Sequence, residues 1–410
     1  MTLRQEADAI IHAALRAAQP DAAVRRALRA LPDCRGRLLL VAAGKAAWQM
    51  AAAAQAALGG RIADGVVITK YGHARGALDG LRIFEGGHPV PDANCFAATD
   101  AAMALARGAG PEDMVLFLLS GGGSALFEKP LLPPQELASL TSALLACGAD
   151  IVEINTVRKR LSAVKGGRFA QLCAPARVFS VILSDVLGDP PDMIASGPAY
   201  PDSSTSEQAQ AIAEKYALPL SGQARALLRE ETPKRLENVQ THIAGSVRQL
   251  CKAACEQCRA LGYRPLVLTD SLRCQAREAG SFLASVAAYH QDSAESLAVI
   301  AGGETVVRVT GTGLGGRNQE LALAAAPGIA GFRDTALFSV GSDGTDGPTD
   351  AAGGYVDGRT ASALRACGLR VDDVLADNDA YHALEAAGGL IVTGATGTNV
   401  NDLTVLLIRR

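Results

Sequence analysis

The run GSDGTDGPTDAAGG, from Gly341 to Gly354, gathers the acidic side chains that a metal–phosphate site needs. It follows the apolar stretch TALFSV and places Asp343, Asp346 and Asp350 among five glycines. Carboxylate oxygens suit Mg²⁺, and glycines let the backbone approach a ligand closely. The same residue types are ordinary turn formers, so a solvated turn is the alternative interpretation.

A second loop with chemical potential is the run SGGGS, which follows the apolar stretch MVLFLL. Its members are Ser120, Gly121, Gly122, Gly123 and Ser124. Successive backbone amides in such a loop can form a nest for a phosphate or a carboxylate. The loop lacks the GK[ST] of a Walker A motif, and glycine stands where a GxSxG elbow needs its serine. A tight structural turn is the alternative.

Two cations stand where an anionic substrate is favoured. Lys45 follows Gly44 after an apolar run and precedes a helix, and a surface lysine is its alternative interpretation. Arg317 begins a predicted helix beside Asn318, and its guanidinium can bind a carboxylate or a phosphate bidentately. Both residues are candidate phosphate-neutralising groups.

The glycines that precede this arginine superficially resemble a dinucleotide fingerprint. They are Gly311, Gly313 and Gly316. They follow only the short run VVRV, which we interpret as a strand of a mixed sheet, and a βαβ unit around them is missing. The series therefore does not predict nicotinamide binding.

Candidate acid–base groups also lie at the ends of apolar runs. His88 in GGHPVPD and His73 in KYGHA are more often hydrogen-bonded structural residues than catalysts, so Asp185 in LSDVLGD is the better base. Lys165 and Arg168 flank a pair of glycines and could reach an anion, although a solvated helix face explains most of the surrounding cations.

The elements that position these residues follow an α/β pattern. Continuous apolar runs such as RLLLVAA, MVLFLLS and RVFSVILS alternate with alanine-rich helical stretches, which indicates a mainly parallel sheet buried on both faces. Ligands of such sheets collect at the carboxyl ends of the strands. A composition shift near residue 235 predicts two α/β domains, 1–235 and 236–410, the second with a mixed sheet.

Composition narrows the class of partner. The net charge is −3 and long basic runs are absent, so nucleic acid is not expected. The N-terminal segment reads as an amphipathic helix, and apolar spans of about 18 residues are absent, so we expect a cytoplasmic protein without membrane contact. Nine scattered cysteines indicate reduced thiols. The pair Cys255 and Cys258 fits helix packing better than metal binding.

Taken together, the ordered motifs resemble the class II glycerate kinase family with its C-terminal MOFRL domain. They are GKAA, ITKYGHA, GGHPVPD, SGGGSAL, NTVRKRLSAVKGGR, LSDVLGDPPDMIASGP, GGRNQE and GSDGTDGPTDAAGG, and they span nearly the whole chain. The resemblance implies a Rossmann-like N-terminal domain with helices on both faces of its sheet. It also implies ATP-dependent phosphorylation of D-glycerate to 2-phosphoglycerate in an interdomain cleft. Some members are labelled hydroxypyruvate reductase, and an NAD(P)H-dependent reductase is the alternative.

The same resemblance assigns roles to particular residues. Lys45 and Arg317 match the charge-neutralising catalytic pair, and Asp185 matches the group at the reacting hydroxyl. The residues expected to bind phosphate or substrate are Ser120, Gly121, Gly122, Gly123, Ser124, His88, Asn318, Asn399 and Asn401. Asp343 and Asp346 are expected to hold Mg²⁺, and a homodimer is left open. The family commonly has His where Arg160 stands and Thr where Asp343 stands.

Overall fold

The computed structural model describes residues 1–410, whose contacts divide into two compact units. One unit runs from Pro20 to Ala244, and the other joins Met1–Gln19 to Gly245–Arg410. We call them the parallel-sheet unit and the mixed-sheet unit. The expected domains 1–235 and 236–410 stay a prediction; the division by contacts falls after Ala244 and adds the first nineteen residues to the second unit.

The parallel-sheet unit is built on six strands in the spatial order β3-β2-β1-β4-β5-β6. The strands are β1 (Leu38–Ala43), β2 (Ile62–Lys70), β3 (Leu81–Gly86), β4 (Met114–Leu119), β5 (Arg177–Leu183) and β6 (Val239–Gly245). This order belongs to doubly wound Rossmann-like sheets, in which the strand order reverses between β1 and β4. The predicted fold class is confirmed, and the reversal opens a crevice at the carboxyl ends of these two strands.

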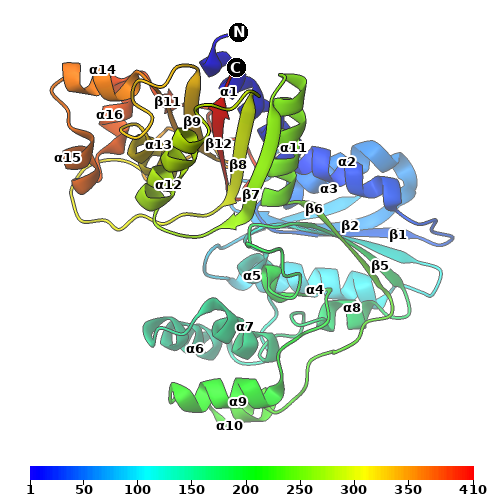
Figure 1. The fold of residues 1–410 in the computed structure, drawn as a ribbon. Helices are drawn as coiled ribbons and strands as arrows, with labels where there is room; N and C mark the ends of the chain where they lie inside the picture. The colour runs from blue at the N-terminus through cyan, green and yellow to red at the C-terminus, as the bar shows by residue number, and fades with distance from the viewer. The chain divides into compact units, whose positions relative to one another are not determined.

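Helices cover both faces of this sheet, as Figure 1 shows. The helices of this unit are α2 (Pro20–Ala27), α3 (Ala47–Leu58), α4 (Ala93–Arg107), α5 (Gly123–Leu126), α6 (Pro134–Ala146), α7 (Ile151–Arg160), α8 (Arg168–Cys173), α9 (Ser206–Lys215) and α10 (Gly222–Leu228). In β1, Leu39 and Val41 belong to the core that includes α4 and α8, whereas Leu38 and Leu40 belong to the core that includes α2 and α3. Because alternate residues of a strand point to opposite faces, both faces need apolar residues. The continuous apolar run follows from this.

A helical layer completes the parallel-sheet unit. Helices α6, α7, α9 and α10 pack around their own apolar cluster, which includes Leu137, Leu140, Val157 and Ala209. They lie beyond the α4 and α8 face in Figure 1.

The mixed-sheet unit has six strands in the order β11-β10-β9-β12-β8-β7. They are β7 (Arg264–Leu272), β8 (Leu297–Gly303), β9 (Thr335–Gly341), β10 (Gly353–Asp357), β11 (Leu390–Ile391) and β12 (Asp402–Ile408). Only β7 and β8 pair in parallel; β12 lies antiparallel between β8 and β9, and β10 is antiparallel to both of its neighbours. The predicted mixed sheet is confirmed.

The interpretation of VVRV as a strand is wrong. Val306 forms a single isolated bridge with Gln275, and its amide donates to the carbonyl of Cys274 at 3.0 Å. A few residues further on, the amide of Thr310 donates to the side chain of Asn378 at 2.7 Å instead of to a neighbouring strand. The segment is thus an anchored loop.

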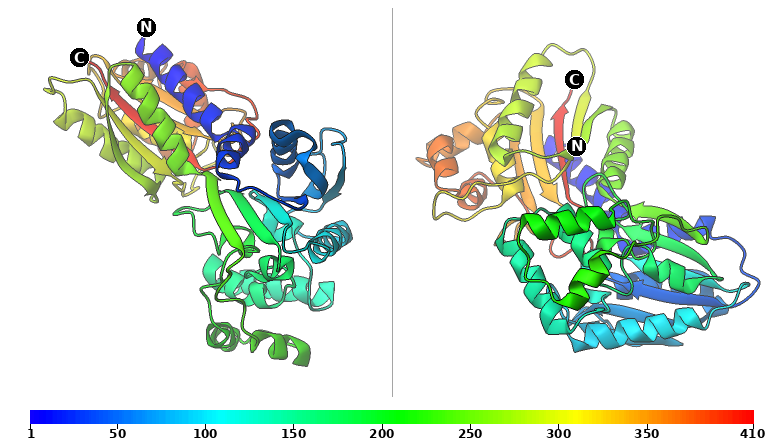
Figure 2. Two further views of the ribbon diagram at one scale, coloured as in Figure 1. Left: turned by 90° about the vertical axis from the view of Figure 1, so that its right-hand side faces the viewer. Right: turned by 90° about the horizontal axis from the view of Figure 1, so that it is seen from below.

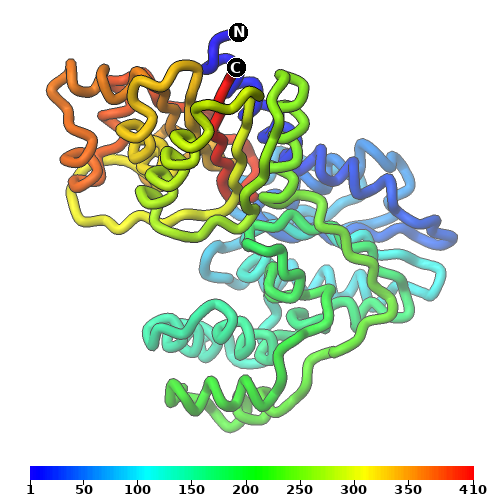
Figure 3. Tube along the Cα trace, in the orientation of Figure 1, coloured from blue at the N-terminus to red at the C-terminus, as the bar shows by residue number.

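Helix α1 (Leu3–Ala18) packs on the mixed-sheet unit, although it begins the chain. Thr2 caps it with a capping box, and the spacing of Ala7, Ile10, Ile11 and Ala14 buries one face. Figure 2 shows α1 in blue beside α11. The two chain ends lie close together in Figure 3. An Arg409 guanidinium donates to the carbonyl of Met1 at 3.0 Å.

The remaining helices of this unit are α11 (Val247–Ala260), α12 (Ala276–Tyr289), α13 (Arg317–Ala325), α14 (Thr360–Ala366), α15 (Val371–Ala376) and α16 (Ala380–Ala386). Cys255 and Cys258 are buried on α11, and burial raises the pKa of the Cys258 thiol to about 12. This agrees with a packing role. No helix of the structure is both long and apolar enough to cross a bilayer.

A cluster of three phenylalanines should carry much of the stability of the parallel-sheet unit. Phe169 lies 5.0 Å from both Phe117 and Phe127 between ring centroids, and all three side chains are fully buried. We predict that Phe169→Ala lowers the free energy of unfolding by about 3–5 kcal/mol, because it leaves a cavity in a packed core. Urea unfolding followed by circular dichroism measures this. Phe282→Ala, on an exposed side chain, is the control and should change it by no more than about 0.5 kcal/mol.

Candidate functional site

The loops after β1 and β4 are joined to each other at the crevice of the parallel sheet. The amide of Lys45 donates to the carbonyl of Gly121 at 2.9 Å, and the amide of Ala46 donates to the Ser120 hydroxyl at 3.1 Å. The Ser120 amide itself donates to the carbonyl of Ala43 at 3.0 Å, which continues the strand pairing. The predicted lysine loop and the SGGGS loop therefore form one structure.

Two glycines of this loop let other side chains approach. Gly122 has φ +84°, and a Cβ there would lie 3.1 Å from both the Cγ of Lys45 and the Cδ2 of His88. At Gly121 a Cβ would overlap Oδ2 of Asp185. The structure thus brings Lys45, His88 and Asp185 around the backbone of these two glycines, and side chains at the glycines would displace them.

The three side chains of this cluster differ in exposure and in charge. Lys45 is exposed, and His88 and Asp185 are half-buried. Burial lowers the pKa of His88, and the nearby charge of Lys45 lowers it further. The imidazole is therefore neutral at neutral pH and can offer a hydrogen-bonding nitrogen, while Lys45 supplies the positive charge.

The last two residues of the SGGGS run pack inward. A Cβ on Gly123 would lie 2.7 Å from the Cβ of Ala195. The carbonyl of Ser124 accepts a hydrogen bond from Lys165 at 2.8 Å and one from Arg158 at 3.1 Å. The predicted substrate roles of Gly123 and Ser124 stay predictions, and their observed contacts hold the short helix α5 in place.

Arg317, at the start of α13, makes a bidentate ion pair within the mixed-sheet unit. Its Nε and Nη2 donate to the two carboxylate oxygens of Asp402 at 2.6 and 2.9 Å, and Nη1 lies 3.4 Å from Glu304. Burial opposes the charge, yet Asp402 and Glu304 together raise the pKa of Arg317. For Asp402 burial raises the pKa of the carboxyl group, and the positive charge of Arg317 opposes that shift. The bidentate grip expected from the sequence is filled here by a carboxylate of the same unit.

The sheet register explains why these groups meet. Asp402, the first residue of β12, lies opposite both Gly303 at the end of β8 and Gly341 at the end of β9. Because β12 runs antiparallel to its neighbours, its start meets their carboxyl ends. Glu304, the acid loop, Asn401 and Asp402 therefore lie together at the carboxyl ends of β8 and β9.

Asp346 acts as the cap of α13. Its Oδ1 accepts from the amide of Asn318 at 3.1 Å and from its side chain at 3.3 Å, and its Oδ2 accepts from the amide and side chain of Gln319 at 2.9 and 3.0 Å. Burial raises the pKa of Asp346 to about 6, against the effect of these donors. The helix-start residue Gly316 has no side chain, so Asp346 supplies the cap from another segment.

The other predicted residues at this end of the sheet differ in exposure. Asn318 is buried and accepts from the Ser339 hydroxyl at 2.6 Å. Asn401 is buried with φ +66° and donates to Glu304 at 3.3 Å, whereas Asn399 is exposed. Asp343 is half-buried, and its Oδ1 accepts from the amide of Thr345 at 3.1 Å. Arg317, Asn318, Asp346 and Asn401 are thus in one neighbourhood.

The donors for a metal ion are less complete than the sequence suggested. The structure contains no group of three or more His, Cys, Asp or Glu side chains placed to hold an ion. Four hydrogen bonds occupy the carboxylate of Asp346, and Asp350 accepts from the Tyr381 hydroxyl at 2.8 Å. A resident metal site does not fit these residues as they stand, and the metal roles of Asp343 and Asp346 stay predictions.

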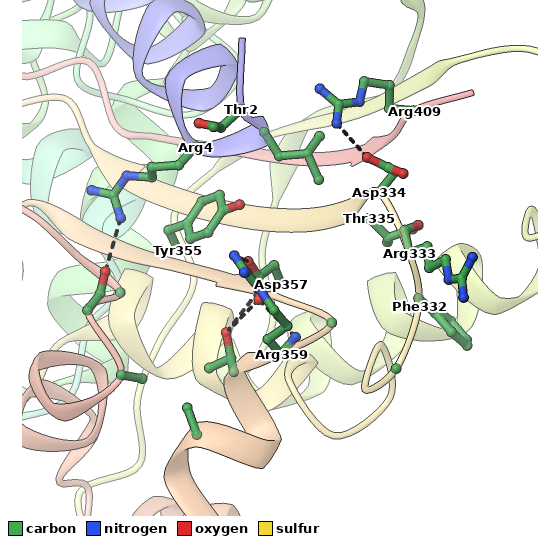
Figure 4. Close-up of a pocket in the computed structure, with 18 of the residues that line it drawn as sticks. Thr2, Arg4, Phe332, Arg333, Asp334, Thr335, Tyr355, Asp357, Arg359 and Arg409 are labelled. Atoms are coloured by element: carbon green, nitrogen blue, oxygen red, sulfur yellow. Dashed lines mark hydrogen bonds and ion pairs between the residues drawn. The ribbon is translucent and has the colours of Figure 1, made fainter.

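Two cavities of the mixed-sheet unit lie at opposite ends of its central strands. One, of about 480 Å³, borders Arg317, Glu304 and a glycine-rich wall. The other, of about 860 Å³, is shown in Figure 4 and contains none of the predicted residues. Two of its arginines are engaged with carboxylates of the same cavity, Arg409 with Asp334 and Arg359 with Asp357. The smaller cavity is therefore the one that belongs to the candidate site.

Comparison with known proteins finds family models, a named relative and a solved structure that all point to one family. Residues 6–229 match a domain of unknown function (DUF4147), and residues 297–402 match the MOFRL family. A Thermotoga maritima protein named D-glycerate 2-kinase is 51% identical over 99% of both chains. A crystal structure of a glycerate kinase from the same organism has a TM-score of 0.95, with 51% identity and 99% of both chains covered. The chain belongs to the class II glycerate kinase family.

One further relative of this chain carries a different name. An Agrobacterium vitis protein that is named as a hydroxypyruvate reductase is 39% identical over all of this chain and 95% of its own length. The Thermotoga and Agrobacterium relatives thus both match the parallel-sheet unit and the mixed-sheet unit.

Arg160, where the resemblance led us to expect His as the common family residue, is a structural residue here. It is fully buried and donates to the carbonyls of Thr156 and Ser204 at 2.9 and 3.0 Å. Asp202 lies 3.8 Å away and compensates its charge. The guanidinium thus connects α7 to the segment before α9.

Sequence reasoning missed two contacts of the candidate site. It gave no role to Asp402, although an acid at the start of an otherwise apolar strand was a usable signal. It considered Lys165 as an anion ligand, yet this side chain is fully buried and donates to the carbonyls of Ser124 and Phe127, with Glu128 at 3.2 Å. Lys165 thus holds the end of the SGGGS loop through hydrogen bonds from the buried interior.

We predict that Lys165→Met lowers the free energy of unfolding by about 3 kcal/mol, because Glu128 then loses a buried partner. Burial lowers the pKa of Lys165 from 10.5 to about 8. The unfolded chain therefore binds more protons than the folded one between these values, so the parent should gain stability as pH rises from about 8 to 10.5. The variant should lack that component.

Urea titrations across this pH range measure both effects. Lys129→Met is the matched control, since its ion pair with Asp100 is partly exposed and should contribute less than about 1 kcal/mol. Equal pH slopes for the parent and Lys165→Met would contradict the assignment.

Proposed function

We propose that the protein transfers the γ-phosphoryl group of ATP to the 2-hydroxyl of D-glycerate and releases 2-phosphoglycerate and ADP. The observation that carries this proposal is the 51% identity over 99% of the chain with a protein named D-glycerate 2-kinase. The cluster of Lys45, His88 and Asp185 and the Arg317 site supply the groups that such a transfer needs. The interdomain cleft that the sequence resemblance implies stays a prediction.

Each group has a proposed role in the transfer. Asp185 accepts the proton of the glycerate 2-hydroxyl. The oxygen of that hydroxyl bonds to the γ-phosphorus of ATP, and the bond between the γ-phosphorus and the β-γ bridging oxygen breaks. Lys45 and Arg317 neutralise the charge of the transferred group, which is the main requirement of phosphoryl transfer. His88, neutral at neutral pH, and the amides of the SGGGS loop orient the substrate. In this proposal Asn318 and Asn401 position Arg317, and Asn399 contacts the substrate.

Magnesium enters this proposal with the nucleotide. ATP is the donor in the form of its Mg²⁺ complex, so the ion is part of the substrate. Asp343 is the acid of the loop best placed to contact it or its water ligands, because the carboxylate of Asp346 already caps α13.

The reductase alternative rests on the name of the Agrobacterium relative. Against it, the segment before the glycine series is a loop, so the strand–turn–helix context of a nicotinamide site is missing there. The kinase proposal therefore fits better.

The proposed setting is the reducing cytoplasm. All nine cysteines carry free thiols, which agrees with such a compartment. The proposed partners are D-glycerate and ATP, with no nucleic acid or membrane, and a homodimer stays open.

The reaction itself can be tested with purified protein, D-glycerate, ATP and Mg²⁺. We predict ADP formation that depends on glycerate, and a product that enolase consumes without added phosphoglycerate mutase, because the 2-hydroxyl is phosphorylated. Hydroxypyruvate with NADH or NADPH should give no oxidation that scales with enzyme. Oxidation at about 10 s⁻¹ without kinase activity would favour the reductase instead.

Variants of the two cations separate catalysis from stability. We predict that Lys45→Ala lowers kcat on the order of 10²- to 10³-fold while it changes the free energy of unfolding by about 0.5 kcal/mol or less, because the side chain is exposed. Arg317→Ala would also leave Asp402 buried without its partner, so Arg317→Lys is the better test of that position. It should lower kcat with a smaller loss of stability.

Steady-state kinetics and urea unfolding measure these effects, with Lys252→Ala, an exposed lysine on α11, as the control. A Lys45→Ala enzyme with kcat within a few-fold of the parent would show that Lys45 is peripheral.

A further inference from the structure

The glycine series before Arg317 has no role in the proposed function so far, yet it forms one wall of the 480 Å³ pocket. The lining includes Gly313, Gly315 and Gly316 together with Gly347 and Pro348. A Cβ on Gly316 would overlap the carboxyl carbon of Asp346, and one on Gly347 would overlap the carbonyl oxygen of Gly315. The wall is therefore flat backbone that side chains cannot enter.

The lining of the pocket also includes apolar side chains that are exposed to solvent. Val306 is 56% and Val309 is 75% exposed, whereas Val307 between them packs against the core. Adjacent exposed apolar residues at the rim of a pocket are typical of a ligand contact.

This apolar rim is held in a fixed position. The amides of Thr310 and Gly311 donate to Oδ1 of Asn378 at 2.7 and 3.0 Å. The amides of Gly313 and Leu314 bind the next turn, at the Asp377 carbonyl and the Asp379 carboxylate. The amide of Thr312 also donates to the Asp377 carboxylate, so every amide of loop 310–314 is anchored. The exposed valines directly before this loop are therefore preorganised for a partner.

The third feature of the pocket is its charge. Arg317 borders it with a guanidinium that is about one-third exposed and already oriented by Asp402. Two carboxylates also line the pocket: Glu304 lies 3.4 Å from Arg317, and Glu320 is paired with Arg277. A ligand in this pocket that contacts the valines and the glycine wall can thus place an anionic group at Arg317.

We propose that this pocket binds the adenine base and ribose of ATP, with the phosphates directed toward Arg317. This inference rests on the proposed function. A purine is flat and apolar on both faces, which fits a pocket lined by valine side chains and bare backbone, and the attached phosphates need a cation at one end. Glycerate is a three-carbon polar acid that has no apolar surface for the valines. The pocket volume also lies in the range of sites for larger ligands.

The test introduces a charge on the apolar rim. Val309→Asp and Val306→Asp should weaken MgADP binding to the full-length protein about tenfold or more in isothermal titration calorimetry, because they replace apolar contact with a carboxylate that repels phosphate. In kinase assays KM for ATP should rise by a similar factor, while KM for glycerate changes by less than about twofold. Val309→Ile should bind like the parent.

Phe282→Asp is the matched control, since Phe282 is 61% exposed, belongs to the same unit and does not line the pocket. It should leave MgADP binding unchanged. Val309→Ala, expected to weaken binding less than Val309→Asp, replaces that variant if circular dichroism shows that the acid prevents folding.

The possible results separate the two proposals. If the parent phosphorylates glycerate and Val309→Asp binds MgADP as tightly as the parent, this inference is wrong and the proposed function stands. If the parent binds MgADP through the valines but phosphorylates no glycerate, the proposed function fails and the pocket assignment is supported. A rise in KM for glycerate alone would assign the pocket to glycerate and overturn the inference.

Discussion

Burial of the central strands on both faces is the constraint that organises the candidate site. In β1, β4, β8, β9 and β12 every residue is buried, so these strands have no solvent-facing side along their length. Polar and charged side chains can then reach a ligand only where a strand ends. The lysine loop, the SGGGS loop and the acid loop each follow such an end, and Asp402 stands at the start of β12 for the same reason.

This constraint also explains what the sequence predicted well. A run such as MVLFLL has no polar residue to face water, so it predicted a doubly covered strand, and the glycine-bearing loop behind it predicted a site. The fold class and the proximity of Lys45, Asp185 and the SGGGS loop follow from this reasoning. Wherever local pattern and sheet geometry agree, the sequence is sufficient.

Tertiary contacts decide the rest. VVRV has the composition of a strand, yet the Asn378 side chain, about seventy positions further along the chain, binds the loop that follows it. Asp346 has the appearance of a metal ligand, yet the start of α13 lacks a cap of its own and takes this carboxylate. Lys165 resembles a surface cation until the fold places it under Ser124 and Phe127. In each case the deciding partner is distant in sequence, where spacing carries no information.

The pair of Arg317 and Asp402 combines structure and function in one interaction. Asp402 is buried, which would be costly for a carboxylate alone, and Arg317 compensates that charge with two hydrogen bonds. In return the carboxylate fixes the guanidinium before any substrate is present, so that little reorganisation is needed when phosphate charge develops nearby. A lysine, with a single ammonium, could compensate the charge but not fix the plane of the donors. Two requirements therefore favour arginine at this position. The buried carboxylate of Asp402 needs two hydrogen-bond donors, and the proposed reaction needs those donors in a fixed orientation.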